Sequence, residues 1–297
     1  MFHQISTILA VIDKVPYDFD DRVFAKLDDS LIEKANFGTP IWKEVTRVYK
    51  QKLQLLQVYV CWIIEDSHVN GEIKCKIADT THLKTFTLDE ALSLDSRFNR
   101  VIDFSIYGDG CGNMKDEALE EFSRILNYAS RFESVALTFP LTQPVPPALL
   151  KCLMESNINP CRLFCNTSLG EEDALKKLLK GANLKHFGML ETLQTSTWSP
   201  SFYGDLEAFV CQPHFKSLLF SSDCFDDAAF QRIVAYWMQA KPTNEWSIST
   251  TVSSDMRDKL AVWLPSCGGN KFKRRIGEFE LVVSCNSSMC LIDLKKQ

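Results

Sequence analysis

The sequence predicts an α/β fold of repeated strand–helix units, and three observations carry this prediction. From Val101 onward, short β-type runs alternate with helical stretches. The units start at residues 101, 132, 161, 184, 215 and 245, so they recur every 23 to 31 residues. Several strands also share one spacing of apolar residues, i, i+3 and i+5. Recurrence on this scale is typical of units that stack on their neighbours around a continuous core.

The first unit shows both halves of the pattern. Residues 101–107 (VIDFSIY) have the length and composition of a strand. In residues 114–128, apolar side chains such as Phe122 and Ile125 recur at three- and four-residue spacing, and acidic residues crowd the first turns, where the helix dipole favours negative charge. This segment is therefore expected to be an amphipathic helix that follows the strand.

The same unit is expected five more times, the last as a strand alone. Further strands are predicted at residues 132–139, 161–165, 184–190, 215–220 and 245–250, and further helices at 147–154, 171–179, 203–210 and 226–238. The apolar spacing aligns Phe132, Val135 and Leu137 with Leu184, Phe187 and Met189, and with Phe215, Leu218 and Phe220. The alternation also permits a doubly wound domain with parallel strands, and this alternative stays open from the sequence.

Two antiparallel pairs are expected outside the repeats. Residues 55–64 and 72–77 flank an Asn70-Gly71 turn signal and predict a hairpin. Residues 279–284 and 289–294 predict a second hairpin that caps the last repeat. The expected organisation is an extension at 1–12, a helical segment at 13–50, a hairpin with connecting region at 51–100, repeats at 101–260 and a cap at 261–297.

Composition excludes several classes of protein. The formal net charge of −5 argues against a nucleic-acid binder, which needs a basic face. The one basic run, residues 271–275, is interpreted as a solvated loop. No apolar run reaches the ~18 residues of a membrane span, and no secretion signal is expected in residues 1–12. The eleven cysteines are interpreted as reduced thiols, which predicts a cytoplasmic or nuclear protein without membrane contact.

The sequence offers little chemistry. The glycines at 108, 110 and 112 follow a strand but lack the spacing of a nucleotide-binding loop, and they predict a flexible turn. The pairs Cys161/Cys165 and Cys211/His214 are isolated, whereas a structural zinc site needs four ligands, so Cys161 and Cys165 are interpreted as buried core cysteines on one face of a strand. His186 is expected to be a solvent-facing strand residue. No catalytic motif is present, so the expectation is a protein that is not an enzyme and uses no cofactor or metal.

The N-terminal segment carries the most informative pattern. Val15-Pro16 opens it, Phe19, Val23, Phe24 and Leu27 form a helical apolar stripe, Leu31-Ile32 adds a second apolar pair, and Trp42 follows Pro40. These residues resemble the F-box. With its repeats, the chain is similar to the large nematode families of F-box-like proteins, whose C-terminal parts carry leucine-rich-repeat-like units.

The resemblance implies a leucine-rich-repeat-like partial solenoid and a substrate receptor of a Skp-cullin-F-box ubiquitin ligase. The apolar residues at positions 15 to 42 would grip the Skp-type adaptor, and the repeats would select an unknown client protein. The segment departs from the family in its Val-Pro opening and its short middle part. Two alternatives stay open: a repeat scaffold with no link to ubiquitin, and an N-terminal segment that only caps the repeats.

Overall fold

The computed structural model describes residues 47, 51–63, 71–95, 98–109, 114–132, 135–139, 145–165, 172–189, 198–223, 225–240, 244–251, 271–285 and 289–297. The residues that resemble the F-box, Val15, Pro16, Phe19, Val23, Phe24, Leu27, Leu31, Ile32 and Trp42, lie outside this part of the chain. The chain divides into two compact units, Met1–Val58 with Lys76–Ile102, and Tyr59–Cys75 with Asp103–Gln297.

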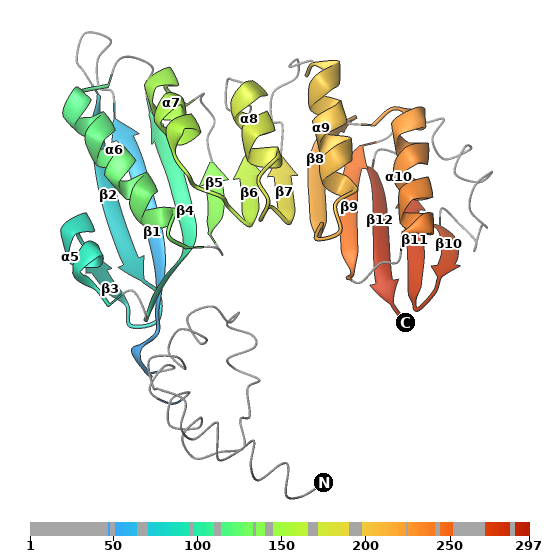
Figure 1. Cartoon of the computed structure of the whole chain (residues 1–297), viewed down its shortest axis with the longest axis horizontal. Helices are drawn as coiled ribbons and strands as arrows, with labels where there is room; N and C mark the ends of the chain where they lie inside the picture. The colour runs from blue at the N-terminus through green and yellow to red at the C-terminus, as the bar shows by residue number, and fades with distance from the viewer. Residues whose placement is uncertain are drawn as a thin grey trace, which may run out of the picture. The chain divides into compact units, whose positions relative to one another are not determined.

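Twelve strands of the described residues form one hydrogen-bonded order, β10-β11-β12-β9-β8-β7-β6-β5-β4-β1-β2-β3 (Figure 1). The first part of the chain supplies β1 (Gln54–Ile63), β2 (Glu72–Asp79), β3 (Lys84–Phe86), helix α5 (Leu88–Ser93) and β4 (Asn99–Asp109). Strands β1, β2 and β4 contribute residues to both compact units.

The predicted N-terminal hairpin is present as β1 and β2. The Thr80 N–H, just after β2, donates to the Leu55 carbonyl near the start of β1 at 2.9 Å, as expected for an antiparallel pair. Strand β3 and helix α5 are additional elements. Helix α5 begins with a capping box, in which the Thr87 hydroxyl accepts from the Glu90 N–H and the Glu90 carboxylate accepts from the Thr87 N–H.

The second unit holds the predicted strand–helix alternation. Its elements in chain order are α6 (Asp116–Ala129), β5 (Ala136–Phe139), α7 (Pro147–Glu155), β6 (Arg162–Cys165), α8 (Glu172–Leu179), β7 (His186–Met189), α9 (Pro200–Val210), β8 (Ser217–Asp223), α10 (Asp227–Gln239) and β9 (Trp246–Thr251). Each falls within a few residues of its predicted position. No helix in the described part of the chain is long and apolar enough to cross a membrane.

Strands β4 to β9 are parallel and follow chain order without a reversal. A doubly wound sheet has one point where the order reverses and carries helices on both faces. Because each parallel crossover is right-handed and leads to the next strand in line, successive helices lie on one face of the sheet. Figure 1 shows α6 to α10 along the same side of the sheet. The doubly wound alternative therefore does not describe β4 to β9.

The helix-covered face holds the core. Phe104, Leu137, Leu163, Phe187, Leu218 and Ile248 are register partners on successive strands, and each is at most 1% exposed. Helix residues pack on this row; for example, the Phe187 and Phe209 rings meet edge to face with centroids 6.4 Å apart. Burial of this apolar area is the main force that holds successive strand–helix units together.

The register corrects one detail of the sequence alignment. Leu137 pairs in register with Leu163 and so aligns with Phe187 and Leu218, whereas the sequence spacing put Val135 at that place. Phe132 is not in a strand, because its N–H donates to the Ala129 carbonyl at 3.2 Å in the turn after α6. A shift of two residues leaves every side chain on the same face, so apolar alternation could not distinguish the two registers.

The C-terminal hairpin is also present, and it contains one more strand than predicted. Strands β11 (Phe279–Cys285) and β12 (Met289–Lys296) pair antiparallel as predicted, and β12 pairs antiparallel with β9. The basic run at 271–275 is not a loop; it lies in strand β10 (Lys271–Ile276), where Phe272 is only 4% exposed. The strand forms because Phe272 is buried and β10 pairs with β11, while the long charged side chains of the run reach the surface.

Candidate functional site

The face of β4 to β9 opposite the helices is the candidate functional site, and we call it the open face. It consists of the strand residues that alternate with the buried row. One row along it is Asp103, Ala136, Arg162, His186, Ser217 and Ser247, and the next is Ser105, Thr138, Phe164, Gly188, Leu219 and Ser249. Most of these residues are partly exposed, so their side chains are available to a partner.

One end of the open face carries a carboxylate held by two hydroxyls. Asp103 Oδ2 accepts from the Ser105 hydroxyl at 2.8 Å, and Asp103 Oδ1 accepts from the Thr138 hydroxyl at 3.1 Å. Both donors lie on the next row, one on the same strand and one on β5. These hydrogen bonds fix the carboxylate on the sheet.

The middle of the open face carries positive charge. Arg162 on β6 and His186 on β7 are register partners, and His186 Nδ1 lies 2.8 Å from the Ser217 hydroxyl on β8. Lys185 and Lys216 come directly before β7 and β8, and the Lys216 N–H donates to the Lys185 carbonyl at 2.8 Å. Burial, and then the charges of Arg162, Lys216 and Lys185, lower the pKa of His186 to about 4. His186 is therefore neutral at neutral pH.

Beside the basic residues lies a small apolar platform. Gly188 sits beneath the Phe164 ring, because a Cβ atom built on Gly188 would lie 2.6 Å from Phe164 Cδ2. Leu219 is the register partner of Gly188 on β8, and it is partly exposed. An apolar platform next to a cluster of charges is the kind of surface on which a partner side chain is anchored.

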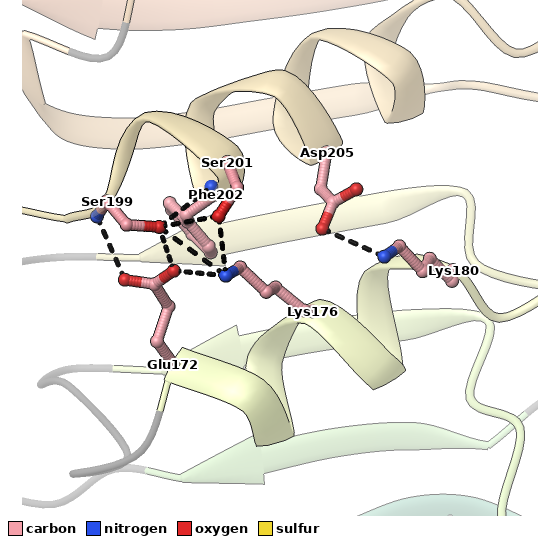
Figure 2. A network of polar contacts seen from close by, with 7 residues as sticks. All are labelled: Glu172, Lys176, Lys180, Ser199, Ser201, Phe202 and Asp205. Atoms are coloured by element: carbon pink, nitrogen blue, oxygen red, sulfur yellow. Dashed lines mark hydrogen bonds and ion pairs between the residues drawn. The ribbon is translucent and has the colours of Figure 1, made fainter.

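A second constellation, between α8 and α9, has the residue types of a serine–lysine catalytic pair (Figure 2). Ser199 is the N-cap of α9, and its hydroxyl accepts from the Phe202 N–H at 3.3 Å. The same hydroxyl donates to Glu172, whose other oxygen accepts from the Ser199 N–H at 2.9 Å. Lys176 Nζ lies 2.5 Å from Glu172 Oε1 and donates to the Ser201 hydroxyl at 2.8 Å.

The electrostatics assign this constellation a structural role. The hydrogen bond from Lys176 and those from Ser199 lower the pKa of Glu172 to about 2, and the hydrogen bond to Glu172 raises the pKa of Lys176. A lysine that activates a serine must lose its proton near neutral pH, and this one is held protonated. The network caps α9 and ties it to α8, with a second tie from Lys180 to Asp205 at 3.1 Å.

Cys165, Cys211 and Gly108, which belong to the candidate motifs of the sequence, also have structural explanations. Burial raises the pKa of Cys165 far above its usual range and that of Cys211 to about 11, so neither thiol is activated. Among the residues that the structure describes, no three His, Cys, Asp or Glu side chains are grouped to hold a metal ion. Gly108 lies inside β4 and not in a turn; its Cβ would meet the Trp62 side chain at 2.2 Å, so close packing requires this glycine.

The sequence did not single out the open-face residues as a site. The signal was present, because Arg162, Phe164 and His186 occupy the positions that alternate with the buried strand residues. The Ser199 cap was missed as well, although Ser-Pro before an apolar helix is a known start signal. Comparison of the chain with protein-family models, with curated proteins and with solved structures found no match.

Proposed function

We propose that this protein is a non-catalytic interaction module whose open face binds another protein. The observation that supports this most directly is the order of β4 to β9, which leaves one broad face of the sheet without helices from the described residues. That face combines a fixed carboxylate, a cluster of cations and an apolar platform, whereas the constellation with catalytic residue types acts as a helix cap. Such a face suits macromolecular contact better than reaction chemistry.

The strand–helix units form a leucine-rich-repeat-like solenoid in this proposal. The register partners on β4 to β9 are separated by 33, 26, 24, 31 and 30 residues, which is a suitable spacing for stacked units. Each unit pairs only with the units next to it. Repeat proteins use the strand side of such stacks as extended binding surfaces.

The N-terminal segment would link this module to ubiquitin transfer. Its sequence pattern from Val15 to Trp42 resembles the F-box, and this resemblance supports a role as a substrate receptor that recruits a Skp-type adaptor. In that role, the adaptor binds the apolar stripe that includes Val23 and Phe24, and the open face holds the client protein.

Co-purification tests the adaptor link. The full chain, expressed in its native cell, is expected to retain a Skp-type adaptor, and the variant Val23→Asp/Phe24→Asp is expected to lose it while it keeps its melting temperature. An intact chain that retains no adaptor would remove the ubiquitin-ligase role. It would leave the second candidate, a scaffold with no link to ubiquitin, which is favoured by the fact that no residue of the open face comes from positions 1–50.

Substitutions on the sheet test the open face itself. Leu219→Asp is expected to release the partner proteins that the wild-type chain captures by cross-linking in cells. Leu83→Asp is the matched control, because Leu83 is 90% exposed and lies in a turn away from the open face in sequence. If Leu219→Asp keeps every partner and the native fold, the open face is not the binding surface.

A further inference from the structure

The centre of the open face holds cations that the described part of the protein does not neutralise. Arg162, Lys185 and Lys216 surround His186, and we call these four residues the basic cluster. Arg162 and His186 are direct register partners, and Lys185 and Lys216 are joined by a backbone hydrogen bond one position earlier. Strand β6 and the residues that lead into β7 and β8 therefore bring four basic residues close together, and the charges of Arg162, Lys185 and Lys216 all act on His186.

Several other charges of the described residues have partners. Asp103 accepts two hydroxyl hydrogen bonds, and Asp293, on β12 at the far side of β9, lies 2.9 Å from Lys295 Nζ. Lys176 and Arg232 on helices, and Lys180 just after α8, lie within ion-pair distance of carboxylates. By contrast, Arg162, Lys185 and Lys216 form no ion pair with another described residue. Their grouping is unusual in a chain whose formal net charge is −5.

The lowered pKa of His186 is consistent with this excess of positive charge. Burial is the main cause of its lowered pKa, and the three neighbouring cations add to that effect. No carboxylate contributes in the opposite direction. A bound anion would therefore gain Coulomb energy here without displacing an internal partner.

The apolar platform lies next to this charge. Phe164 and Arg162 point to the same face of β6, because they are two residues apart. Gly188 and His186 have the same relation on β7, as do Leu219 and Ser217 on β8. The two rows are two residues apart along each strand, roughly 7 Å, so an extended segment that lies along these strands can place carboxylates on the basic cluster and an apolar side chain on the platform.

We infer that the open face binds an acidic segment of a partner protein, with Asp or Glu carboxylates at Arg162, Lys185 and Lys216 and an apolar side chain against Phe164 and Leu219. This inference rests on the proposed function of the open face. Arginine is suited to bidentate recognition of carboxylates, and lysine adds a point charge. Nucleic acid is a poorer fit, because Asp103 and Asp293 flank the cluster on the same sheet and would repel a phosphate backbone.

A displayed library of random 12-residue peptides, selected against the full chain, tests this inference. Peptides that bind the open face are expected to be rich in Asp and Glu and to contain an aromatic or aliphatic residue. Arg162→Glu/Lys185→Glu is expected to weaken a selected peptide by about tenfold or more, and raising the salt concentration from 50 to 500 mM should also weaken binding by about tenfold. Both residues are exposed, so the variant should fold normally.

The matched control is Arg131→Glu/Lys151→Glu, which reverses one exposed arginine and one exposed lysine outside the open face. It should leave peptide affinity unchanged. Peptides that lose affinity with Leu219→Asp but lack acidic residues and ignore Arg162→Glu/Lys185→Glu would overturn the inference and leave the proposed function standing. Peptides insensitive to all open-face changes, or a single-stranded oligonucleotide that binds more tightly than any peptide, would overturn both.

Discussion

Glu172 at the start of α8 accepts hydrogen bonds from both the backbone N–H and the hydroxyl of Ser199, the N-cap of α9 (Figure 2). One carboxylate thus orients the cap of the next helix, while Lys176 neutralises it from the following turn. The contact joins two successive strand–helix units at their helices, whereas strand pairing joins them at the sheet.

Ser199→Ala tests this connection. The variant loses the α9 cap and leaves Glu172 with fewer donors, so the free energy of unfolding should fall by about 1–2 kcal/mol. Denaturant unfolding measures the loss. Ser201→Ala is the control, because Ser201 is exposed and does not cap the helix; its effect should stay within about 0.5 kcal/mol. Equal effects of the two variants would contradict the capping role.

The pH dependence of stability tests the environment of His186. The folded pKa is about 4, below the ordinary value of 6.5, so between these values the unfolded chain binds a proton that the folded protein does not. Stability should therefore fall as the pH falls from about 6.5 to about 4. Because His186 is partly exposed, we expect a loss on the order of 1 kcal/mol.

The variant His186→Gln isolates this contribution. Glutamine keeps a polar group beside Ser217 but does not titrate, so the variant should lose less stability than the wild type between pH 7 and pH 4.5. The low pKa of Glu172 acts in a lower window, from its ordinary 4.5 to about 2, where stability is lost as the carboxylate is protonated. Identical pH profiles for wild type and variant above pH 4.5 would show that His186 titrates normally when folded.

Alternation on β8 predicts opposite outcomes for two neighbouring leucines. Leu218 is 1% exposed in the core, and Leu218→Ala should lower the free energy of unfolding by about 2–5 kcal/mol. Leu219 lies on the open face, and Leu219→Ala should cost less than about 1 kcal/mol. Thermal or denaturant unfolding of the pair decides the register of β8. A larger loss at Leu219 would mean that the two faces are assigned the wrong way round.

The sequence predicted the strand–helix alternation because each element carries its own periodic signal. Helix α6 has apolar residues at helical spacing, and the strand around Leu218 has buried side chains two residues apart. The exact register at Leu137 was not predictable, since a two-residue shift preserves the pattern. Strand β10 was predicted as a loop because four of the residues at 271–275 are charged and Phe272 is the one core residue among them.

The open face was harder to predict than the fold. Arg162, His186 and Lys216 are 24 to 54 residues apart in sequence, and only the strand register brings them together. No local pattern marks such a cluster, because each repeat contributes one or two of its members. The Gly188 contact has the same origin, since Phe164 belongs to a different repeat.

Three glycines should respond to alanine in graded ways set by the space around them. A Cβ atom added to Gly204 in α9 would have nothing within 4 Å, so Gly204→Ala should raise the free energy of unfolding by about 0.5–1 kcal/mol through helix propensity. Gly188→Ala must displace the Phe164 ring, which lies 2.6 Å from the new carbon, and should lower the free energy of unfolding by about 1 kcal/mol. The second substitution Phe164→Ala should relieve that clash. Gly108→Ala meets both the Trp62 ring at 2.2 Å and the Trp62 carbonyl oxygen at 2.4 Å, so it should cost the most, about 3 kcal/mol.

Thermal unfolding of the three single variants checks this order. A Gly188→Ala protein as stable as Gly204→Ala would mean that the Phe164 ring does not rest on Gly188, and the apolar platform of the open face would lose its structural basis.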